Sequence, residues 1–164
     1  MEGPVLTELS AFTEDERDRI IETPGVVLKG AIVADGSKNA LAFLKEVTAG
    51  AKVFREAQRH ENAFVKAVAT ALKDRGTGVE NDHELPFTDV AMTAALKQAE
   101  EALALLRERG DATDADAYAD WLLRIATEVA KAARSKEAGF FSRKVDISEG
   151  EKLFIEQLTA AVGR

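Results

Sequence analysis

The chain has 164 residues, of which 46 % are hydrophobic and 31 % charged, and its formal net charge is −7. This size predicts one domain over residues 1–164 that is large enough to bury a hydrophobic core. An acidic chain lacks the basic surface that nucleic acids and anionic lipids require, so neither is an expected partner. There are no cysteines, which excludes disulfides and thiolate chemistry.

The N-terminal stretch is acidic and lacks the charged-then-apolar pattern of a signal peptide. The longest strongly apolar run, residues 26–34, is far shorter than the ~20 residues that a membrane-spanning helix needs. We therefore expect a cytoplasmic protein with no membrane contact.

The first helical signals lie near the N-terminus. Thr13 and Glu16 form a capping-box pattern, which predicts a helix over about residues 14–22. Thr23 followed by Pro24 is typical of a new helix start, so a second helix is expected over residues 26–34. Because this apolar segment has no polar face, we expect it to be buried at the centre of the fold.

Apolar residues at every third or fourth position predict the remaining helices. No alternating run is long enough to predict a strand, and residues 59–62 fit either a break or a continuation of a helix. The last helix is expected to be capped by Ser148 and Glu151, and the one before it by Thr113. The sequence therefore predicts an all-α bundle of about seven helices around residues 26–34, the later ones over residues 38–58, 64–75, 89–109, 114–134 and 149–162.

Two segments of the chain are alike. Residues 35–47, DGSKNALAFLKEV, and residues 146–158, DISEGEKLFIEQL, both place an aspartate two positions before a capping serine and then an amphipathic helix. Any two capped helices share these features. The alternative interpretation is a duplication of one helical unit, which would give the bundle two related halves.

These two segments, with VADGS before the first helix, resemble the paired signatures of the TerB-like family of tellurite-resistance proteins over about 30 residues. The resemblance implies an all-α fold, a link to metal and chemical stress, and acidic turns that bind a divalent cation. The chain departs from the family pattern at two positions. Ala40 stands where the second segment has Glu151, and Ile147 stands where the turn glycine is expected. Half of such a site is therefore missing.

A divalent-metal site, if the resemblance holds, would use the acidic residues Asp146, Glu149 and Glu151 with Asp35. A hard cation takes six or more oxygen ligands, more than these side chains readily supply. The same carboxylates beside a helix N-terminus also stabilise its dipole, which is the simpler interpretation.

The sequence contains few of the residue patterns that enzymes use. Its two histidines are His60 and His83, and HENAF lacks the second histidine of a zinc-protease helix. The loop of residues 76–87 is expected to be solvated, although His83 and its carboxylates could hold a metal loosely. Neither a nucleophile elbow nor a phosphate-binding loop is present, so we expect neither an enzyme nor a cofactor.

The connector of residues 139–148 carries two adjacent phenylalanines, Phe140 and Phe141, followed by Arg143 and Lys144. Either both rings pack onto the core, or one stays exposed beside the two cations and contacts a partner. The sequence thus favours a non-enzymatic protein that acts through protein contacts, in a bacterial stress response, with a homo-oligomer as one form of such contact. The candidate contact surface is the connector of residues 139–148 together with the loop of residues 76–87. The alternative is a divalent-metal-binding TerB-like domain.

Overall fold

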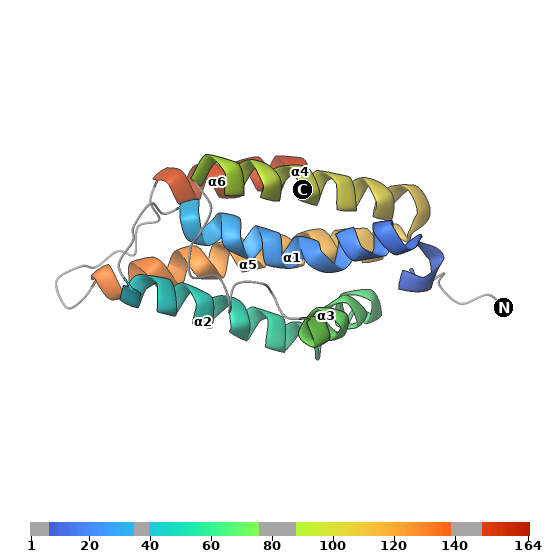
Figure 1. Cartoon of the computed structure of the whole chain (residues 1–164), viewed down its shortest axis with the longest axis horizontal. Helices are drawn as coiled ribbons and strands as arrows, with labels where there is room; N and C mark the ends of the chain where they lie inside the picture. Colours follow the sequence, from blue (N-terminus) through green and yellow to red (C-terminus); the bar gives the residue numbers. More distant parts are fainter. Residues whose placement is uncertain (1–6, 35–39, 76–87, 139–148) are drawn as a thin grey trace.

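The computed structural model describes residues 7–34, 40–75, 88–138 and 149–164, with the side chains of residues 40–44, 88 and 133–138 left aside. Every regular element in these ranges is helical, which confirms the all-α prediction (Figure 1). No helix within them is long and apolar enough to cross a membrane. In chain order the elements are η1 (Leu9–Ala11), α1 (Glu14–Ala34), α2 (Ala40–Ala57), α3 (Ala63–Arg75), α4 (Thr88–Arg109), α5 (Ala112–Ala138) and α6 (Glu149–Ala161).

The N-terminal capping box forms as predicted. The backbone N–H of Thr13 donates to Oε1 of Glu16 at 2.9 Å, and the N–H of Glu16 donates to Oγ1 of Thr13 at 3.3 Å. These bonds pair two of the backbone donors that a helix start leaves open, so α1 begins at Glu14.

The predicted break at Pro24 is wrong. Pro24 lies inside α1, which continues without interruption to Ala34, so the described residues contain six α-helices where about seven were expected. A proline inside a helix removes one backbone donor and leaves the carbonyl four residues earlier without its partner. That carbonyl belongs to Ile20, and it accepts a hydrogen bond of 2.7 Å from the hydroxyl of Tyr118 on α5. A tertiary contact therefore compensates for the missing donor.

The rest of α1 is packed on several sides. It contacts each of the other five α-helices, and Ile20, Val27, Leu28 and Ile32 are at most 2 % exposed. Burying side chains of this size contributes about 1.5–3 kcal/mol each relative to leaving them in water.

Small residues let α1 approach α4 and α6 closely. A Cβ at Gly30 would lie 2.9 Å from the Cβ of Ala95 on α4 and 3.0 Å from Cζ of Phe154 on α6. A larger side chain at this position would push the three helices apart.

Two helix boundaries settle details that the pattern left open or misplaced. Residues 58–62 separate α2 from α3, so the segment 59–62 is a break. At the start of α5, Oδ2 of Asp111 accepts from the N–H of Thr113 at 3.0 Å. Asp111 is therefore the capping residue, where the sequence pattern had favoured Thr113.

Candidate functional site

The described part of the predicted metal site lies where α6 begins. Glu149 is exposed, whereas Glu151 is only 2 % exposed. A Cβ at Gly150 would clash with the carbonyl oxygen of Ala34, so the start of α6 abuts the end of α1. The other two predicted ligands, Asp35 and Asp146, lie outside the described residues. The two glutamates thus differ, since one is exposed to solvent and the other is buried.

A second buried carboxylate, Glu46 on α2, was missed by the sequence analysis. Its side chain is 1 % exposed. It precedes the buried residues Gly50, Val53 and Ala57 by 4, 7 and 11 positions, which places it on their face of the helix. This spacing was readable in the sequence, but a glutamate is almost never expected to be fully buried. Among the described residues, no three acidic, histidine or cysteine side chains are grouped as metal ligands.

The predicted partner contacts Phe140, Phe141, Arg143 and Lys144 lie outside the described residues, as does the loop of residues 76–87 with His83. The structure does describe the helices that follow these two segments, α4 and α6. In their first two turns lie the exposed large hydrophobic side chains of this part of the chain, Val90 on α4 and Leu153 on α6, 59 % and 49 % exposed.

The helices α4 and α6 lie side by side and run in the same direction (Figure 1). Ala95 and Phe154 meet at Gly30, and further along Nη2 of Arg107 donates to the carbonyl of Val162 at 2.9 Å. Val90 precedes Ala95 by five residues and Leu153 precedes Phe154 by one, so their positions differ by roughly 6 Å along the helices. We call Val90 and Leu153 the exposed apolar pair.

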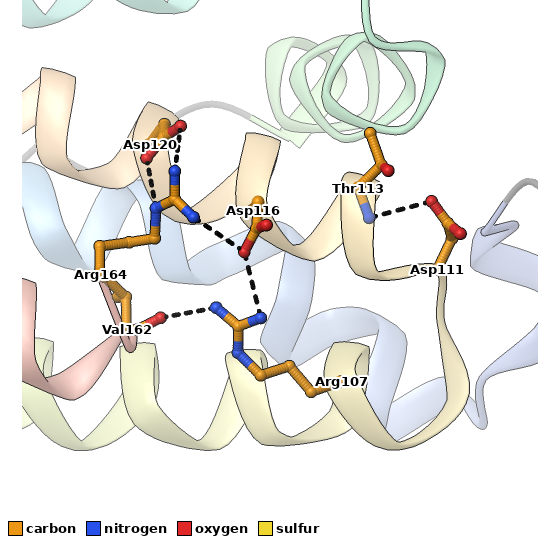
Figure 2. A network of polar contacts seen from close by, with 7 residues as sticks. All are labelled: Arg107, Asp111, Thr113, Asp116, Asp120, Val162 and Arg164. Atoms are coloured by element: carbon orange, nitrogen blue, oxygen red, sulfur yellow. Dashed lines mark hydrogen bonds and ion pairs between the residues drawn. The ribbon is translucent and has the colours of Figure 1, made fainter.

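The opposite end of α6 is held by ion pairs (Figure 2). Oδ1 of Asp116 on α5 lies 3.2 Å from both Arg107 and Arg164. Arg164 also reaches Asp120, with Nε 3.0 Å from Oδ1. Because these groups are about half exposed, each pair contributes at most ~1 kcal/mol, and their effect is to fix the end of the chain on α4 and α5.

A buried aspartate joins three segments near the start of α5. Asp114 is 4 % exposed. Its Oδ2 accepts from the backbone N–H of Thr7 at 2.9 Å, and its Oδ1 accepts from Nδ2 of Asn62 at 2.8 Å. The Oδ1 of Asn62 in turn accepts from the N–H of Val65 at 3.0 Å and caps α3. In the sequence, Asp114 is an acidic residue of the first turn of a helix, where a carboxylate stabilises the helix dipole. The hydrogen bonds to Thr7 and Asn62 give it a longer-range role that this local position does not predict.

Grooves in the described part of the molecule are shallow and lined by charged side chains. One of about 550 Å³ lies between α1 and α4, with Asp15, Asp18 and Glu22 on one side and Lys97 and Glu101 on the other. Across the two helices, Arg19 forms an ion pair with Glu101 at 3.2 Å.

Comparison with known proteins adds no assignment: no protein-family model, no curated protein and no solved structure matches this chain.

Proposed function

We propose that this chain is a non-enzymatic helical protein that acts by contacting another protein through the region where α4 and α6 begin. The observation that carries the proposal is the exposed apolar pair, Val90 and Leu153. Each follows, within a few residues, one of the two segments singled out as contact regions, residues 76–87 and 139–148. A large exposed hydrophobic side chain gains free energy when a partner covers it.

The test is site-specific photo-crosslinking in cells. A photoreactive amino acid is placed at Val90 or Leu153, and in control proteins at Ala104 or Ala160, which are exposed further along the same two helices. We expect crosslinks to one defined protein from the first two positions only. Equal crosslinking from all four positions would contradict the proposal, and a crosslink to a second copy of the chain would identify a homo-oligomer.

The TerB-like resemblance and a cytoplasmic role in bacterial stress belong to the same proposal. Two observations support them: the resemblance of the sequence, and the close approach of Ala34 and Gly150. Ala34 directly precedes the first of the two similar segments and Gly150 lies within the second, as expected if two related halves pack against each other.

A second candidate function is divalent-metal binding, which is favoured by the burial of Glu151 at the junction of α1 and α6. Chelator-treated protein would be titrated calorimetrically with calcium, magnesium, manganese and zinc, and compared with Asp146→Ala, Glu151→Ala and Glu149→Ala. If Glu151 is a ligand, saturable binding is lost in the first two variants. Since Glu149 is exposed, its variant shows whether this second glutamate also contributes. A binding isotherm that is unchanged in Glu151→Ala would eliminate this candidate.

A further inference from the structure

The corner between α2 and α3 depends on a hydrogen bond accepted by a histidine ring. The backbone N–H of Asn62 donates to Nδ1 of His60 at 2.9 Å. A ring nitrogen accepts a hydrogen bond only through its lone pair, so Nδ1 carries no proton and the neutral ring holds its proton on Nε2. A flipped ring would place a carbon against the N–H, so the contact itself selects this orientation.

Asn62 is also the residue that caps α3. Its Oδ1 accepts from the N–H of Val65, and its Nδ2 donates to the buried Asp114. The hydrogen bond to His60 orients the backbone of the same residue. One ring nitrogen therefore supports the position of a helix cap that is also joined to α5.

The ring is half-buried, so protons from solvent can reach it. It lines a small cavity of about 120 Å³ between α2 and α5, together with the charged residues Glu56, Asp120 and Arg124. Glu56 is ion-paired with Arg124. Asp120, which also lines this cavity, is paired with Arg164.

The neighbours of His60 in the chain are also charged. Arg59 precedes it and Glu61 follows it, and both are exposed to solvent. The groups that face the ring thus carry both signs, and the nearby carboxylates on α2 and α5 already have cationic partners.

We propose that His60 is an acid-sensitive element that controls the capping of α3. Proton uptake at Nδ1 turns the acceptor into a donor that faces the N–H of Asn62, so the hydrogen bond is lost and the cap loosens. Histidine is the side chain that ordinarily changes charge between about pH 5 and 8, and this sets the pH range of the test. This inference is independent of the proposed protein contact at α4 and α6.

The test follows the backbone amides of Asn62 and Val65 by nitrogen–proton NMR from about pH 8 to pH 5. Two variants separate the acceptor from the charge. In His60→Asn the side-chain oxygen can accept from the N–H two residues later, as in an Asx turn, and does not titrate. In His60→Ala no acceptor is present at any pH.

In the wild type we expect both amide resonances to shift as the pH falls. We also expect the protection of both amides, that is their exchange rate relative to an unstructured peptide at the same pH, to decrease. In His60→Asn the chemical shifts and the protection stay constant, and in His60→Ala the Asn62 amide is unprotected at every pH. Constant shifts and protection in the wild type, or the same change in His60→Asn, would overturn the proposal.

Thermal unfolding measures the effect on the whole fold. The melting temperature of the wild type should fall by about 2–4 °C more than that of His60→Asn between pH 8 and pH 5, the loss of one hydrogen bond. The other histidine, His83, is present in both proteins, so its contribution cancels. An equal fall in both proteins would overturn the claim that His60 holds α3.

Discussion

Different kinds of contact hold the two ends of the bundle together. At the end where α5 begins, Thr7, Asn62 and Asp114 join three distant segments through hydrogen bonds; we call this the polar end. Towards the other end of α1, Gly30 meets Ala95 and Phe154 through apolar contacts; we call this the apolar end. Hydrogen bonds are directional and fix how segments are oriented, whereas small apolar residues fix how closely helices approach.

The difference also bears on function. At the polar end, side chains of the N-terminal segment, α3 and α5 already use each other's donors and acceptors. At the apolar end the side chains that remain exposed include Val90 and Leu153, which have hydrophobic surface left to bury. Under the proposed function, a partner would therefore bury more hydrophobic surface by covering the apolar end.

The largest expected effect is at the apolar end. Phe154→Ala should lower the free energy of unfolding by about 3–5 kcal/mol, because the ring is 1 % exposed and its removal leaves a cavity against Gly30. Leu153→Ala, one residue away and about half exposed, is the control and should change stability by less than ~0.5 kcal/mol. Chemical denaturation measures both. Equal losses would show that the ring is not part of the core.

At the polar end, Asp114→Ala should lower the free energy of unfolding by about 3 kcal/mol, because it leaves donors of Thr7 and Asn62 without an acceptor. The control is Asp116→Ala on the same helix. Asp116 makes half-exposed ion pairs, and its removal should lower the free energy of unfolding by less than ~1 kcal/mol. If denaturation curves of the two variants coincide, the buried network is not what holds the polar end.

Between the two ends, the hydroxyl of Tyr118 donates a hydrogen bond to the carbonyl of Ile20. Tyr118→Phe should therefore lower the free energy of unfolding by about 1–3 kcal/mol. In the double variant with Pro24→Ala, a new backbone N–H can donate to the same carbonyl, so much of this loss should be recovered. The single Pro24→Ala variant closes the double-mutant cycle. Strictly additive losses would mean that the tyrosine does not compensate for the proline.

The smallest effect concerns Glu16. The pKa of its carboxyl is held below the ordinary value of 4.5, first by the backbone N–H of Thr13 and then by the guanidinium of Arg109. A lowered folded-state pKa stabilises the protein above the unfolded value, and this stabilisation is lost as the pH falls through the folded value.

Glu16→Gln lacks this titration. The difference in melting temperature between wild type and Glu16→Gln should therefore shrink as the pH is lowered from about 7 to about 3. Circular dichroism melts at several pH values measure this difference. A difference that does not vary with pH would mean that the ionised form of Glu16 contributes nothing to the polar end.

Much of the local structure was determined by the sequence itself. Helical spacing predicted residues 89–109 for the helix that spans Thr88–Arg109, and the pair Thr13 and Glu16 predicted the cap that forms. These signals are local, since they depend on residues three or four positions apart on one helix.

Only the tertiary structure decided the rest. Pro24 reads locally as a helix start, and it stays inside α1 because Tyr118, 94 positions later, supplies the missing donor. Glu46 and Asp114 read as surface charges, and both are buried. Asp114 is bonded to Thr7 and Asn62, which are distant from it in the sequence. The outcome at such positions depends on which donors and apolar surfaces the folded chain brings to them, and a single segment does not contain that information.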